Sequence, residues 1–162
     1  MSVERDFISL IKTHEGMLYK LSRAYADTRE DRQDLYQEIV YQIWKSFGSF
    51  KGKSQISTWM YRVALNTAIA HLNKQKKQGK RQDSDQLFNK LFEEQDAVLD
   101  QQVAYLYQQI KQLKQVNRGI ILLLLEGKSY QEIAEITGFS SSNIGTRINR
   151  IKTQLKANKP KT

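Results

Sequence analysis

The hydrophobic residues of this chain recur at helical spacing over most of its length, and the alternation typical of strands is scarce. The clearest pattern lies in residues 129–155. Ser129 and Glu132 form a capping box that predicts the start of a short helix, and Gly138 predicts its end. A basic helix is expected to follow, with one apolar face made by Ile144, Ile148, Ile151 and Leu155. The pattern predicts a helix-turn-helix, whose second helix can enter the major groove of DNA.

Earlier parts of the chain also follow helical periodicity. Long helices are expected at about 3–26, 28–47 and 55–75, and shorter ones near 101–113 and 117–126. The second helix has a wide apolar face that includes Leu35, Ile39 and Trp44, and the fourth has Val103, Leu106, Ile110 and Leu113. In the third helix the apolar residues cover more than one face, so periodicity does not indicate which side is core. The single proline, Pro160, lies near the C-terminus and interrupts none of these helices.

A polar segment, residues 76–100, separates the first three helices from the rest and changes from basic to acidic. Within it, apolar residues at 87–92 could dock on a domain or a partner. We therefore expect an all-α fold of two small helical domains joined by a flexible linker, the C-terminal one a helix-turn-helix. The expected bounds are 1–77 for the N-terminal domain, 78–100 for the linker and 101–162 for the C-terminal domain.

The net charge of +9 is concentrated in two blocks. Residues 51–82 carry eight basic and no acidic side chains, and residues 111–162 carry ten basic and three acidic ones. Residues 83–110, between them, carry one basic and six acidic side chains. A single basic block is often only a solvated surface, but two blocks, one of them on a helix-turn-helix, favour two contacts with nucleic acid.

Aromatic and amide side chains are interleaved with lysine and arginine side chains in residues 50–77. Single-stranded nucleic acid requires this mixture, because cations contact the phosphates while π-faces and amides contact unstacked bases. Trp59 and Tyr61 could equally belong to the core of a helix. Their position after a basic loop, with Arg62 and Asn66 nearby, favours the functional interpretation.

Three stretches together resemble bacterial extracytoplasmic-function (ECF) sigma factors. DRQDLYQEIVYQIWKSFGSF resembles the family's polymerase-binding segment, and FKGKSQISTWMYRVALNTAIAHL resembles its segment for reading and melting the minus-ten element. EGKSYQEIAEITGFSSSNIGTRINRIKTQL resembles its helix-turn-helix for the minus-thirty-five element. The three occur in the family's order across about 150 residues, which is far more specific than a helix-turn-helix alone.

The resemblance implies roles for particular residues and partners. Contacts with core RNA polymerase are implied for Asp34, Gln37, Glu38 and Tyr41. Contacts with the promoter's minus-ten element are implied for Ser54, Gln55, Ile56, Ser57, Trp59, Tyr61, Arg62, Asn66, Lys74, Lys76 and Lys77. Contacts with the minus-thirty-five element are implied for Ser141, Ser142, Asn143, Thr146, Arg147 and Arg150. An anti-sigma factor is a further expected partner.

Three departures from the family pattern bear on promoter preference, and one is the turn at Gln115-Val116-Asn117, where the family usually has a proline. Ile56 stands where the family often has an aromatic residue in the loop that holds a flipped base. Gly145 stands where the recognition helix often has a lysine. We expect these departures to shift which promoter sequences are read.

The same residues limit the alternatives. A free-standing operator-binding regulator would explain the helix-turn-helix but not the 51–77 segment. A nuclease would need converging carboxylates, which the 51–82 block lacks, so we expect no enzyme activity. The chain has no cysteine and two isolated histidines, of which His14 fits a helix core, so neither a metal nor a cofactor is expected. The N-terminus lacks a signal-peptide pattern and no apolar run could span a membrane, which favours a cytoplasmic location without membrane insertion.

Overall fold

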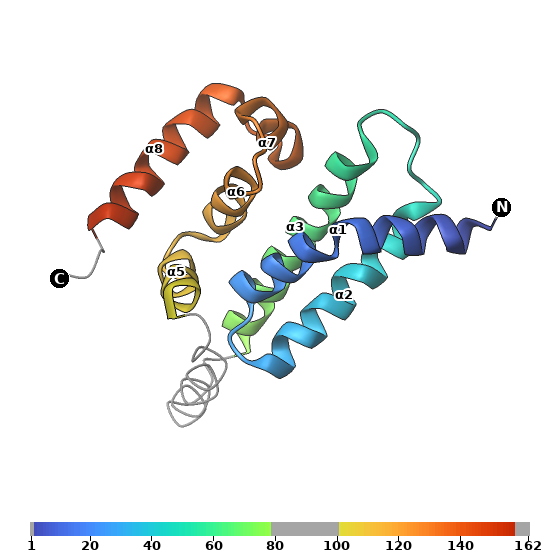
Figure 1. Ribbon diagram of the computed structural model, residues 1–162, viewed down its shortest axis with the longest axis horizontal. Helices are drawn as coiled ribbons and strands as arrows, with labels where there is room; N and C mark the ends of the chain where they lie inside the picture. Colours follow the sequence, from blue (N-terminus) through green and yellow to red (C-terminus); the bar gives the residue numbers. More distant parts are fainter. Residues whose placement is uncertain (1, 79–100, 158–162) are drawn as a thin grey trace.

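The computed structural model describes residues 2–78 and 101–157, and within these ranges every regular element is an α-helix. Figure 1 shows the helices, which are α1 (Val3–Tyr25), α2 (Arg29–Phe47), α3 (Ile56–Lys77), α5 (Gln101–Lys111), α6 (Gln115–Leu125), α7 (Tyr130–Thr137) and α8 (Ser141–Ala157). The expected all-α class is confirmed. Apart from residue 78, the expected linker lies outside the described residues, and so does the apolar stretch at 87–92.

Helices α1, α2 and α3 form an N-terminal bundle. The Thr28 side chain accepts a hydrogen bond from the Asp31 amide at 2.9 Å, which starts α2 where its cap predicts. The apolar stripes of α1 and α2 meet around the fully buried side chains of Leu18, Leu35 and Ile39. On α3 the buried residues are Thr58, Met60, Tyr61, Ala64, Leu65 and Ala68.

Two residues assigned to apolar faces are not buried as expected. The Trp44 side chain is 42% exposed at the edge of the apolar face of α2, where its ring packs against the Phe7 ring. Leu106 is 37% exposed, because Tyr107 and Ile110 turn α5 toward the core instead. Both corrections concern residues beside a stripe, where helical periodicity alone does not fix the edge of the buried face.

Helices α5 to α8 form the C-terminal unit. The capping box of Ser129 and Glu132 starts α7, and Gly138 ends it with a φ of 86°. The next helix, α8, buries Ile144, Ile148 and Ile151, and partly buries Leu155, against α6 and α7. The helix-turn-helix predicted from the sequence is therefore present.

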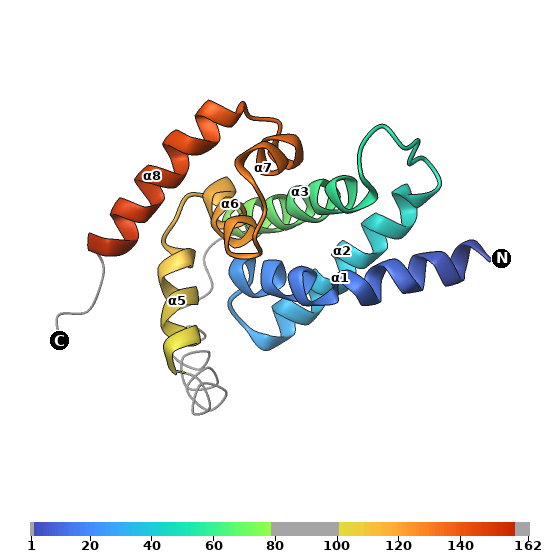
Figure 2. The same ribbon diagram turned by 45° about the horizontal axis from the view of Figure 1, so that its top comes forward.

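The two units pack against each other. In both views α6 lies between α8 and the pair α1 and α3 (Figures 1 and 2). A Cβ atom added to Gly119 on α6 would lie 2.3 Å from Cδ1 of Leu65 on α3, so any larger residue here would have to displace Leu65 or move the two helices apart. The buried Tyr25 hydroxyl accepts a hydrogen bond from the Gly119 amide at 2.9 Å and donates one to the Gln115 carbonyl. One hydrophobic core therefore runs through both units.

Candidate nucleic-acid interface

The second helix of the helix-turn-helix, α8, presents a polar, basic face. The Ser140 hydroxyl starts this helix by accepting a hydrogen bond from the Asn143 amide at 3.1 Å. Between α8 and the start of α6 lies a groove of about 620 Å³. Cationic and amide side chains line much of this groove. Four come from α8, namely Asn143, Arg147, Arg150 and Gln154, and two come from the start of α6, namely Lys114 and Asn117.

All six residues predicted to approach the minus-thirty-five element lie on α8. Five are exposed, namely Ser141, Ser142, Asn143, Thr146 and Arg150. The sixth, Arg147, is half-buried at the floor of the groove. Because they project opposite the buried isoleucines, the structure brings these side chains together on one surface.

Residues predicted for the minus-ten element begin in the loop before α3. Ile56, at the start of that helix, is 38% exposed, and Gln55 beside it is exposed. Ser54 and Ser57 are half-buried. An aliphatic side chain that stays exposed at this place offers apolar contact to a base, although it offers no ring for stacking.

Trp59 is half-buried in an aromatic cluster. Its ring centroid lies 6.4 Å from that of Phe47 and 5.2 Å from that of Phe50. The cluster anchors the loop after α2 to the first turn of α3. Trp59 therefore supports the loop with one side and leaves part of its ring accessible.

Tyr61 is buried, with 5% of its surface exposed. Its hydroxyl lies 2.8 Å from Nδ1 of His14, and the Lys128 ammonium lies 5.5 Å from its ring centroid. Burial and then the nearby Glu126 carboxylate raise the pKa of Tyr61 to about 12. Burial and then Lys128 lower the pKa of His14, so its imidazole is neutral near pH 7, and its Nδ1 and the Tyr61 hydroxyl share one hydrogen bond. This burial does not support the role predicted for Tyr61 as a contact for an exposed strand.

The remaining predicted minus-ten residues lie along the exposed side of α3. Arg62 is exposed, and its guanidinium donates a hydrogen bond of 2.6 Å to the Glu135 carbonyl of α7. Asn66 and Lys74, Lys76 and Lys77 are also exposed. The lysines form a basic end to the helix, as expected for a surface that follows phosphates.

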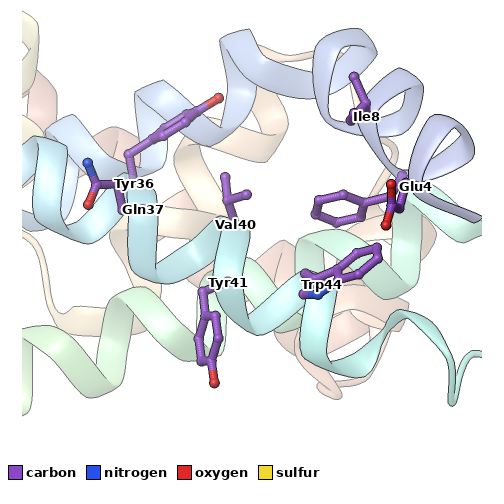
Figure 3. Close-up of a pocket in the computed structure, with 8 residues that line it drawn as sticks. Glu4, Ile8, Tyr36, Gln37, Val40, Tyr41 and Trp44 are labelled. Atoms are coloured by element: carbon purple, nitrogen blue, oxygen red, sulfur yellow. The ribbon is translucent and has the colours of Figure 1, made fainter.

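A separate apolar groove of about 510 Å³ lies between the first half of α1 and the outer face of α2 (Figure 3). Gln37 and Tyr41, both predicted to contact polymerase, line it, and the Tyr41 side chain is 55% exposed. Sequence reasoning missed the contribution of α1, which consists of Glu4, Phe7 and Ile8. Ile8 was the signal that could have indicated it, because this apolar residue lies off the helix face that buries Phe7, Leu18 and Leu21, and it is 52% exposed.

The other two residues predicted to contact polymerase lie elsewhere on α2. Asp34 and Glu38 are exposed, and neither lines the groove. Both carboxylates act on His71 of α3, where they partly oppose the effect of burial, which lowers the pKa of that imidazole. The four predicted residues are all exposed, and their spacing places them on one face of α2, of which Gln37 and Tyr41 form the edge beside the groove.

Within residues 2–78 and 101–157, three or more potential metal ligands do not gather at any point. Over the same ranges, no helix has the length and apolar content that crossing a bilayer requires.

Comparisons with known proteins match both units. Residues 10–78 match the model of sigma-70 region 2, and residues 104–155 match that of sigma-70 region 4. The chain is 30% identical to RNA polymerase sigma factor YlaC of Bacillus subtilis, over 82% of this chain and 80% of that protein. It is 28% identical to the ECF RNA polymerase sigma-E factor of Escherichia coli K12, over 94% of this chain and 85% of that protein.

A solved structure shows the same fold. The sigma factor RpoE, in complex with the anti-sigma factor NepR from Bartonella quintana, matches with a TM-score of 0.66 and 18% identity. The match covers 96% of this chain and 99% of that one. With both regions matched in order, the chain belongs to the extracytoplasmic-function family of RNA polymerase sigma factors, which are transcription initiation factors.

Proposed function

We propose that this protein binds core RNA polymerase, directs it to specific promoters, opens the minus-ten element and reads the minus-thirty-five element. The observation that carries the proposal is the match of region 2 and region 4, in that order, to the two units that bear the candidate surfaces. The apolar groove of α1 and α2 binds the polymerase. The exposed side of α3 contacts the opened strand, and the polar face of α8 contacts the upstream duplex.

The proposal also covers partners, location and chemistry. The protein acts in the cytoplasm, where polymerase and chromosome are found, and it catalyses no reaction of its own. Because the similar sigma factor RpoE is held in a complex with an anti-sigma factor, we include such a protein among the partners of this chain. The N-terminal domain is 1–77, the linker 78–100 and the C-terminal domain 101–162.

Two tyrosines provide a matched test of polymerase binding. Tyr41 lines the groove and is 55% exposed, whereas Tyr19 is 53% exposed and lies outside the groove. We expect Tyr41→Ala to weaken binding to core polymerase by about tenfold or more, as aromatic anchors at interface centres do. Tyr19→Ala should bind like the wild type. Gel filtration and fluorescence titration with purified core enzyme measure both.

Run-off transcription then tests promoter recognition. The wild-type protein with core polymerase should give specific transcripts from a promoter library randomised at both elements. Failure to co-elute with core enzyme would overturn the proposal. Tight and specific duplex binding without polymerase would instead favour a free-standing helix-turn-helix regulator.

A further inference from the structure

Arg147 is held on three sides at the floor of the α6–α8 groove. Its Nε donates a hydrogen bond of 2.7 Å to Oδ1 of Asn143, one turn earlier on α8. Its Nη1 donates one of 3.2 Å to Oδ1 of Asn117, in the first turn of α6. The guanidinium carbon lies 4.3 Å above the ring centroid of Phe139, in the turn between α7 and α8.

These contacts differ in what they fix. Asn143 and Arg147 belong to the same helix, so their hydrogen bond does not tie the guanidinium to the rest of the unit. Asn117 is half-buried and comes from a different helix, and it is therefore the polar contact that ties the guanidinium to the scaffold. The Phe139 ring gives the guanidinium an apolar surface to stack on, but stacking does not fix how the guanidinium is rotated within its own plane. The Nη2 group has no hydrogen-bond partner among residues 2–78 and 101–157, and it remains able to donate.

A restrained arginine is suited to reading a base. An unrestrained side chain of this length loses conformational entropy when it binds and can reach several acceptors. A guanidinium fixed in plane presents its remaining N–H groups in one direction, which favours one base edge in the major groove over its neighbours. The phosphates cannot supply this selectivity, because they are the same at every base pair.

We propose that Asn117 is a positioning residue that determines promoter specificity, because it orients Arg147 toward one base pair of the minus-thirty-five element. This inference rests on the proposed function and assigns a role to a residue of α6 outside the recognition helix. Asn117 acts through Arg147, and the base contact is made by the Nη2 group, which Asn117 leaves able to donate.

Two substitutions of nearly equal size separate the hydrogen bond from the shape of the side chain. Asn117→Asp keeps the acceptor oxygen, and its charge suits the first turn of a helix. Asn117→Leu removes the acceptor and favours the helix over asparagine. Both variants should therefore fold, which thermal unfolding followed by circular dichroism checks.

The test is run-off transcription by the holoenzyme on a library randomised across the minus-thirty-five element. Arg147→Ala identifies the base pair that the arginine reads. At that pair we expect a wild-type preference of about tenfold, falling to about twofold or less in Asn117→Leu. Asn117→Asp should keep the preference while total transcript falls, because its carboxylate repels the phosphates. The double variant Asn117→Leu/Arg147→Ala should match Arg147→Ala, since the first change acts only through the second residue.

Other outcomes overturn the inference in distinguishable ways. An unchanged preference in Asn117→Leu, with specific wild-type transcripts, overturns it and leaves the proposed function standing. Loss of preference at several base pairs together with a lowered melting temperature shows a structural role instead and also overturns it. If the wild type itself gives no promoter-specific transcripts, the proposed function fails and the inference fails with it.

Discussion

Gly119 and Gly145 both lie inside helices, but their surroundings give them opposite meanings. A Cβ at position 145 would lie 3.5 Å from Cε2 of Tyr130, which is ordinary van der Waals contact. At position 119 it would lie 2.3 Å from Cδ1 of Leu65, a side chain that is only 3% exposed and has little room to move. Gly119 is therefore needed for packing, and Gly145 is not.

Alanine substitutions should separate the two glycines. Gly145→Ala is expected to raise the free energy of unfolding by about 0.5–1 kcal/mol, because alanine loses less backbone entropy in a helix. Gly119→Ala gains the same propensity, but overpacking costs about 1–3 kcal/mol, so we expect a net decrease of about 1 kcal/mol. Urea denaturation of both variants measures the difference. Equal effects of the same sign would show that helix propensity alone determines the change in the free energy of unfolding at both positions.

Helices α7 and α8 could be predicted closely from the sequence because their signals are local. The capping box of Ser129 and Glu132, the left-handed Gly138 and the isoleucine spacing each act within a few residues. No comparable signal defined the core side of α3, because that helix packs against α1 and α2 on one side and α6 and α7 on the other. Its apolar residues consequently spread around the helix, and only the tertiary contacts show that Tyr61 is buried.

Two adjacent serines at the start of α8 test how much the N-terminal cap stabilises that helix. The Ser140 hydroxyl accepts from the Asn143 amide at 3.1 Å, whereas the Ser141 hydroxyl has no hydrogen-bond partner among the described residues. We expect Ser140→Ala to lower the free energy of unfolding by about 1 kcal/mol. Ser141→Ala should change it by less than about 0.5 kcal/mol. Thermal and urea unfolding compare them, and a Ser141→Ala variant as destabilised as Ser140→Ala would contradict the assignment of the cap.

The arrangement of the two units could not be predicted from the sequence, because no local pattern encodes it. It depends on contacts between distant residues, such as the Arg118 guanidinium, which donates to the Ala24 carbonyl at 2.9 Å. It also depends on the close approach of α3 and α6 at Leu65 and Gly119. In this arrangement Lys128 covers the ring of Tyr61, and the Glu135 carbonyl occupies one amino group of Arg62. Part of the surface proposed to contact the opened strand thus faces the C-terminal unit.

If α3 is to contact a separated strand along its length, the two units must part at the promoter. Cysteines at positions 65 and 119 can test this, because the natural chain contains none. The two positions are close enough to bridge, since a Cβ at position 119 would lie 3.3 Å from Cγ of Leu65. We expect the oxidised Leu65→Cys/Gly119→Cys variant to give about tenfold less specific transcript than its reduced form, because the bridge removes the parted conformation from the population.

Matched controls assign the loss to the bridge. The single variants Leu65→Cys and Gly119→Cys should transcribe equally under oxidising and reducing conditions. The oxidised double variant should still co-elute with core polymerase, because neither residue lines the groove of α1 and α2. Full transcription by the bridged form would mean that the separated strand passes over α3 while the two units stay packed. Arg62 would then bind that strand with the donors that its contact to the Glu135 carbonyl leaves free.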